Sequence, residues 1–110
     1  MRLLSEDMEN LAHAVERLTA AGYRDDFRAE PGGLRAVETG RVHEPESLVI
    51  DEMVRFEGES DPDEEVVVFA LNSASAGTRG TYVVTFGTYV DPLDALMVRR
   101  LSRRAARSRT

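Results

Sequence analysis

The apolar positions at the start of the chain follow a helical period. Five of them recur at alternating spacings of four and three residues: Leu4, Met8, Leu11, Val15 and Leu18. This spacing lines one face of an α-helix and predicts a helix over about 5–21, with Ser5 as its N-cap. Gly22 suits the left-handed conformation that often follows a last helical turn. His13 falls on the polar side of the helix, so we expect it in solvent.

The pattern then changes to alternation. The segments 25–29 and 34–38 alternate weakly around the turn signal PGG at 31–33, which predicts two short strands in a hairpin at a sheet edge. The next segment, GRVHEPES at 40–47, contains a proline and is expected to be a connecting loop. Its one imidazole, His43, and its two carboxylates make a poor transition-metal site.

Three stronger strands follow, at 48–57, 65–72 and 80–89. The first alternates and is expected to place one set of side chains on a single face: Leu48, Ile50, Glu52, Val54 and Phe56. The second, EVVVFALN, is apolar on both faces, which is typical of a buried central strand. Short polar connections predict that the three strands form an antiparallel meander.

The chain closes with a second predicted helix, which Asp91 is placed to cap and Pro92 to begin. Its apolar stripe consists of Leu93, Leu96, Met97 and Leu101. Two amphipathic helices can bury their stripes against one face of a mostly antiparallel sheet. The sequence therefore predicts an α+β fold, a two-layer sandwich of about five strands with the N- and C-terminal helices on one face.

The length of 110 residues fits one domain over 1–104, followed by an arginine-rich tail at 105–110 that we expect to be frayed. Because the central strand is apolar on both sides, helices on one face leave the other face uncovered. We expect that face, or an edge strand, to support self-association into a homo-oligomer, or else to form a ligand groove.

Charge divides the chain into two parts. All 14 basic residues are arginine, and residues 1–98 hold 20 acidic residues against 8 arginines, a net charge of −12. Residues 99–110 hold 6 arginines and no acid. The acidic part would repel a phosphate backbone, so we expect a nucleic-acid partner only through the basic C-terminal segment. The same arginines could instead complement the dipole of the last helix.

Other properties of the composition bear on location. No apolar run approaches the ~18 residues of a membrane-spanning helix. The first residues, MRLLSEDMEN, turn acidic too early for a signal peptide. Cysteine is absent, which excludes disulfides and thiol nucleophiles. We therefore expect a cytoplasmic, bacterial-type protein without a membrane partner.

The densest group of possible ligands is the segment RFEGESDPDEE at 55–65, which contains six carboxylates. Such oxygens could attract Mg²⁺ or Ca²⁺. A turn explains the residue order better, because an acid at Asp61 followed by a proline suits a type I turn between two strands. We therefore predict no metal site and no cofactor, with partner contact and cation binding as alternatives.

Arg55 and Glu57 share a face of the predicted strand. There the arginine could hold an anionic ligand or form a cross-strand ion pair. Hydroxyl groups farther along the chain, such as that of Tyr82, could add to a pocket. The candidate ligand-binding set is Arg55, Glu57, Asp61, Asp63 and Arg79.

Motifs for enzyme chemistry are missing from the sequence. Lysine is absent, which excludes the P-loop, and neither Gly-x-Gly-x-x-Gly after a strand nor Gly-x-Ser-x-Gly occurs. The two histidines are both expected in solvent or in a loop, so a serine–histidine–acid triad has little support. We predict no catalytic residue, and whether the protein is an enzyme stays open.

Three stretches carry a resemblance: RFEGESDPDEE with VVVFAL after it, Gly22-Tyr23 with Asp26-Phe27 downstream, and GTYVVTFGTYVDP. In these the chain resembles a family of small uncharacterised bacterial proteins with an RFEGxSDPxDE motif. The resemblance covers nearly the whole chain, and members often carry the label phosphoribosylpyrophosphate synthetase. It implies no catalytic residue that can be placed in this sequence.

Three functional hypotheses follow. The leading one is a small non-enzymatic interaction or regulatory domain that self-associates, with the open sheet face and the acidic loop as contact surfaces. The first alternative is a nucleotide or sugar-phosphate binding protein that uses Arg55 and Arg79 with a divalent cation. That cation would be held by Glu57, Asp61 and Asp63. The second alternative is an RNA-associated factor that acts through the basic tail.

Overall fold

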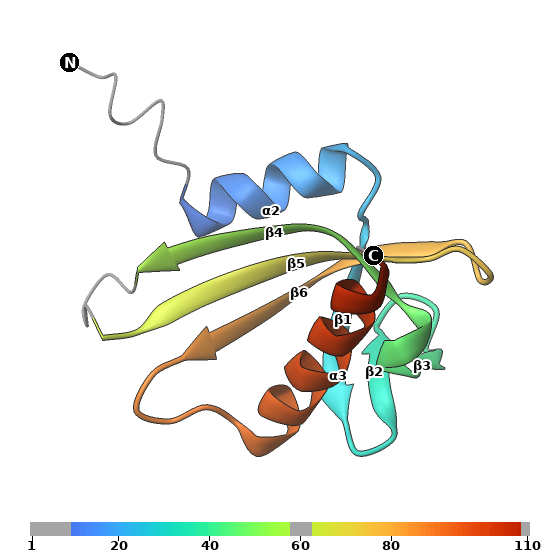
Figure 1. The fold of residues 1–110 in the computed structure, drawn as a ribbon. Coiled ribbons are helices and arrows are strands. Elements are labelled where there is room, and N and C mark those ends of the chain that lie inside the picture. The colour runs from blue at the N-terminus through green and yellow to red at the C-terminus, as the bar shows by residue number, and fades with distance from the viewer. Residues whose placement is uncertain (1–9, 58–62, 109–110) are drawn as a thin grey trace.

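The computed structural model describes residues 10–57 and 63–108, with side chains described as far as residue 101. Its elements are α2 (Leu11–Ala20), β1 (Asp25–Glu30), β2 (Gly33–Ala36), β3 (Val42–His43), the 3-10 helix η1 (Pro45–Ser47), β4 (Val49–Glu57), β5 (Glu65–Ser73), β6 (Thr78–Phe86) and α3 (Pro92–Ser108) (Figure 1). The described strands form a six-stranded sheet in the order β3-β2-β1-β6-β5-β4. Neighbours are antiparallel except β1 and β6, which run parallel. The α+β class, the mostly antiparallel sheet and the β4–β5–β6 meander are therefore confirmed, with six strands in place of about five.

The two helices pack on opposite faces of the sheet (Figure 1). Residues of α3 join the larger buried cluster: Phe27, Leu34, Ala36, Leu48, Val67, Phe69, Leu71, Tyr82, Val84, Met97 and Leu101. On the other face, Leu18 of α2 packs with Val68 and Ala70 of β5. The prediction of both helices on one face was wrong, because β5 is apolar on both sides and each side takes its own helix. Both faces of β5 are covered by helices, so self-association cannot be inferred from an uncovered face of this strand.

A β-bulge in β4 changes which face its side chains occupy. Ile50 pairs with Leu71 and Glu52 pairs with Ala70, so that Asp51 is the extra residue between them. A bulge of this kind shifts the alternation by one position. Ile50 consequently packs against the α3 side and Phe56 against the α2 side. The predicted single face from Leu48 to Phe56 was therefore wrong.

The segment expected to be a loop at 40–47 contains structure. Within it, β3 pairs with β2 and forms an edge of the sheet, so the β1–β2 hairpin lies inside the sheet and not at its edge. His43 on β3 is buried, with 5% of its surface exposed, although we expected it in a loop. Its ring meets the ring of Phe27 edge-on, with centroids 5.8 Å apart. This contact across the sheet explains why the local sequence did not reveal the burial.

The helix ends follow local rules. Asn10 caps α2, since its Oδ1 accepts a hydrogen bond from the His13 N–H at 2.8 Å, and Asn10 itself has extended dihedral angles. The helix therefore begins later than predicted, and the expected cap Ser5 lies outside the described residues. The exposed position of His13 and the positive φ of +112° at Gly22 are as predicted.

The start of α3 is also as predicted. The Asp91 Oδ1 accepts from the Leu93 N–H at 2.9 Å, and Pro92 is the first helical residue. In the predicted stripe, Met97 and Leu101 are fully buried, whereas Leu96 is exposed.

Candidate functional site

The acidic segment connects two paired antiparallel strands, as predicted. β4 ends at Glu57 and β5 begins at Glu65, and these two residues face each other in register. Asp61, and with it the proposed type I turn, lies outside the described residues. Asp63 is exposed at the described end of the connection. Among the residues that the structure describes, no group of three or more His, Cys, Asp or Glu side chains could hold a metal ion.

The candidate arginines are not brought together. Arg55 lies opposite Val67 of β5, and its Nη1 is 3.7 Å from a carboxylate oxygen of the half-buried Glu65. Arg79 lies opposite Asn72 of β5, with its guanidinium 5.3 Å from the centre of the Tyr23 ring. Their partners Val67 and Asn72 are five residues apart on β5, which is about 17 Å along the strand at ~3.3 Å per residue. An odd separation along a strand places the two arginines on opposite faces of the sheet. A single ligand site made of both arginines is not supported by this arrangement.

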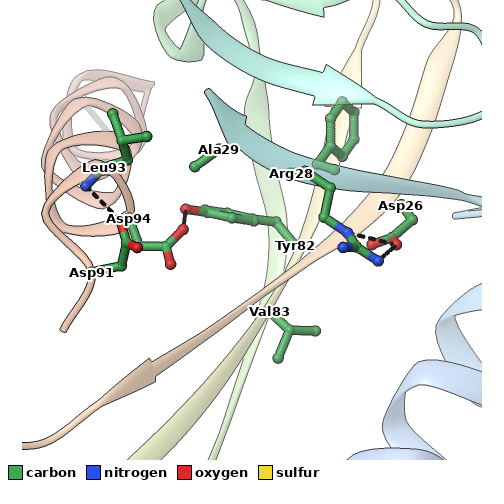
Figure 2. A pocket seen from close by; sticks show the side chains of 9 residues that line it. Asp26, Arg28, Ala29, Tyr82, Val83, Asp91, Leu93 and Asp94 are labelled. Carbon is green, nitrogen blue, oxygen red and sulfur yellow. Dashed lines mark hydrogen bonds and ion pairs between the residues drawn. The ribbon is translucent and has the colours of Figure 1, made fainter. Parts of the chain in front are cut away.

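The structure instead shows a groove between β1, β6 and the start of α3, which we call the β1–β6 groove. Its volume is about 590 Å³. Its lining residues are Asp26, Phe27, Arg28, Ala29, Tyr82, Val83, Asp91, Leu93 and Asp94 (Figure 2). The three chain segments involved are far apart in the sequence.

The groove exists because β1 and β6 pair over a short distance only. Their register is limited to Asp25–Asp26 with Gly80–Thr81. The close approach there depends on glycine, since a side chain at position 80 would overlap the Asp25 carbonyl oxygen. Beyond this point β6 stays paired with β5 as far as Phe86, and β1 stays paired with β2. The sheet therefore splits between β1 and β6.

Part of the β1 backbone faces the groove. The Asp26 carbonyl accepts a hydrogen bond from the Val37 N–H, on the β2 side, at 2.9 Å. Backbone groups alternate in direction along a strand of an antiparallel pair, so those of Phe27 and Ala29 point the other way, toward β6. An extended chain placed in the groove could pair with such groups.

Tyr82 and Asp94 meet where the groove adjoins the first turn of α3. Tyr82 is 2% exposed, and its hydroxyl donates a hydrogen bond to the Asp94 Oδ1 (Figure 2). Burial raises the pKa of the Tyr82 phenol, and the hydrogen bond and charge of Asp94 raise it further. The phenol therefore stays protonated and acts as a donor that orients the Asp94 carboxylate.

The charges of the groove are mainly negative. Asp91 and Asp94 come from the first turn of α3 and its cap, while Asp26 and Arg28 lie on β1. The Arg28 guanidinium already pairs with Asp26, at 2.8 Å between Nη2 and Oδ2. Three carboxylates against one paired guanidinium leave a net negative site, which favours a cationic ligand.

Sequence reasoning considered Asp91 only as a helix cap and Tyr82 only as a possible hydroxyl donor, and it missed Asp94. The spacing of Asp91 and Asp94, three residues apart at a helix start, is the one signal that could have suggested a paired carboxylate site.

Comparisons of the chain with protein-family models, with curated proteins and with solved structures found no match. Of the helices in the described part of the chain, none is both long and apolar enough to cross a membrane.

Proposed function

We propose that this protein is a non-enzymatic interaction domain that binds an extended, positively charged segment of a partner polypeptide in the β1–β6 groove. The observation that carries the proposal is the split of the sheet after Gly80–Thr81, which leaves two strand edges facing each other beside three carboxylates.

The strand edges support an extended peptide as the ligand. Where β1 and β6 no longer pair with each other, such a peptide can form hydrogen bonds with both strands, with its backbone against Ala29 on one side and Val83 on the other. Alternate side chains of an extended peptide point to opposite sides. Every second side chain could then reach the carboxylates of Asp91 and Asp94.

The charge distribution supports a basic partner. The first 98 residues carry a net charge of −12, so the domain attracts cationic segments over a distance and repels acidic ones. In the groove, the described residues offer the second oxygen of Asp94 no hydrogen-bond partner, so a lysine or arginine side chain can bind there.

The chemistry of the groove fits binding better than catalysis. The raised pKa of Tyr82 keeps its phenol from acting as a base near neutral pH. Asp91 is engaged by the Leu93 N–H and Asp26 by Arg28. A carboxylate with one partner can still accept a further hydrogen bond from a cationic ligand. Among the described lining residues there is no activated nucleophile.

Peptide titration tests the proposal. A short fluorescent peptide of alternating arginine and valine should raise its anisotropy on binding, and the same peptide with glutamate in place of arginine should not. Asp94→Asn should weaken binding about tenfold, because a charge-assisted hydrogen bond is replaced by a neutral one. Glu38→Gln removes an exposed carboxylate outside the groove and is the matched control. Equal binding of both peptides, or unchanged binding by D94N, would contradict the proposal.

The hypothesis of self-association now depends on the two edge strands of the described sheet, β3 and β4. β3 is only two residues long, and β4 carries a bulge at Asp51 and several charged side chains, which are features that oppose edge-to-edge pairing. Light scattering over a range of protein concentrations checks it directly. Binding of RNA through the basic tail stays a prediction, since the side chains after residue 101 lie outside the described part.

A further inference from the structure

A second, smaller pocket lies between β3, η1 and the turn from β5 to β6. Its volume is about 240 Å³, the space of about eight water molecules at ~30 Å³ each. It therefore suits a small ion or a single chemical group. Its lining residues are Arg41, Val42, His43, Glu44, Ser47, Ser73, Ser75 and Ala76, none of which lines the β1–β6 groove.

Hydrogen-bond donors converge on this pocket from separate elements. Ser73 is buried and its Oγ accepts from the Ala76 N–H at 3.3 Å, so its hydroxyl proton remains to be donated. The hydroxyl of Ser75 and the guanidinium of Arg41 form no hydrogen bond or ion pair with any other described residue. Ser47 differs, because its hydroxyl already donates to the Glu44 carbonyl at 2.7 Å.

His43 provides an independent indication of a ligand. The side chain is more than nine-tenths buried, and its Nε2 is a buried atom without a hydrogen-bond partner in the described part of the chain. Buried polar atoms are normally paired, and this unpaired atom belongs to a residue that lines the pocket, so a ligand bound there is a candidate for the missing partner. Burial lowers the pKa of this imidazole, Arg41 lowers it further, and Asp25 partly opposes them. The remaining charged group at the pocket is the Glu44 carboxylate.

We propose that this pocket binds a phosphate-type oxyanion, held by the Arg41 guanidinium, the hydroxyls of Ser73 and Ser75, and the His43 ring. A tetrahedral oxyanion presents acceptor oxygens in several directions, which matches donors that come from β3 and from the β5–β6 turn. The pairing of a guanidinium with two of those oxygens supplies the charge. Glu44 opposes the anion, so the site depends on Arg41 for a favourable balance of charge.

An NMR titration tests this site through the two histidines. Inorganic phosphate and, separately, glycerol phosphate are added at constant ionic strength, with sodium chloride as the reference. We expect a saturable shift of the His43 ring signals and an upward move of the His43 pKa, because an adjacent anion favours the protonated imidazole. The exposed His13 ring should not respond, and it serves as the internal control.

Variants locate the binding. Arg41→Gln should weaken it at least tenfold, and Ser75→Ala, an exposed change that leaves the fold intact, should weaken it severalfold. Arg55→Gln is the matched control, since Arg55 lies opposite Val67, about 20 Å along β5 from Ser73 at ~3.3 Å per residue. Amide spectra show whether each variant is folded.

The outcomes separate the possible ligands. Saturation by both compounds assigns the pocket to a terminal phosphate group, and saturation by inorganic phosphate alone assigns it to the free ion. No saturable shift of His43, or binding to R41Q as tight as to the wild type, overturns the proposal. Equal weakening by R41Q and R55Q would do the same, because it would indicate an effect of overall charge.

Discussion

The hydrogen bond from Tyr82 to Asp94 joins β6 to the first turn of α3, and Tyr82→Phe removes it while keeping the ring. The ring should stay in place, because Tyr82 is 2% exposed and its ring centre lies 6.0 Å from that of Phe69. A hydrogen bond to a charged group contributes about 1.5–3 kcal/mol. Asp94 is half-buried and regains water when the phenol is lost, so the lower end applies. We expect Tyr82→Phe to lower the free energy of unfolding by about 1.5 kcal/mol, which corresponds to a fall in Tm of roughly 6 °C.

Urea unfolding at pH 7, followed by circular dichroism, measures this loss. Tyr89→Phe is the control, since Tyr89 is 89% exposed and its change should have no measurable effect. The reasoning would be refuted if Y82F lay within about 0.5 kcal/mol of the wild type. It would also be refuted if Y89F lost as much stability as Y82F.

The same variant tests the raised pKa of Tyr82. The folded state holds the phenolic proton to higher pH than the unfolded state, whose tyrosines titrate near ~10. This contribution to stability is fully present below about pH 10 and is lost as the pH rises above it. Wild-type stability should therefore fall more steeply than that of Y82F between about pH 9 and 11. Tyr23, whose pKa is raised by its hydrogen bond to Asp51, contributes equally to both proteins.

Two further predictions concern the sheet and the buried histidine. Gly80→Ala should lower the free energy of unfolding by about 3 kcal/mol, because the added methyl group would overlap the Asp25 carbonyl oxygen. Gly32→Ala is the control, since open space surrounds Gly32 and the change should be nearly neutral. Thermal melts measure both. The lowered pKa of His43 means that the unfolded state binds a proton first as the pH falls below about 6.5, so wild-type stability should decline by up to ~1.4 kcal/mol per pH unit there. His43→Leu should flatten that decline and His13→Gln should not; a decline that H43L leaves unchanged would contradict the burial of His43.

Local chemistry was sufficient for the start of α3, the end of α2 and the central strand, but not for the start of α2 or for β3 and η1. Asp91 and Pro92 begin α3 for two local reasons. The Asp91 carboxylate accepts a hydrogen bond from the Leu93 N–H, and Pro92 has no N–H that would stay unpaired in the first turn. Gly22 ends α2 in a left-handed conformation that other residues avoid. The two-sided apolar character of β5 correctly indicated the central strand of the meander.

Long-range contacts explain where the predictions were wrong. Neither helix stripe contains information on which face of the sheet it will cover, and the structure placed α2 and α3 on opposite faces. The bulge at Asp51 interrupts an otherwise regular alternation in β4. The Asp51 carboxylate accepts a hydrogen bond from the Tyr23 hydroxyl at 2.6 Å, and Tyr23 lies far away in the sequence. His43 stands in a polar segment and is buried only because β3 pairs with β2 and Phe27 packs against it.

The sequence by itself determined the α+β class, the antiparallel meander and the strongly acidic character of the first 98 residues, since periodicity and charge are local or additive properties. The tertiary structure alone decided the sites. The β1–β6 groove requires a parallel pairing that ends after Gly80–Thr81, and it joins segments near residues 26–29, 82–83 and 91–94. Whether these segments come together depends on where β1 and β6 separate, and the spacing of residues along the sequence contains no information on that.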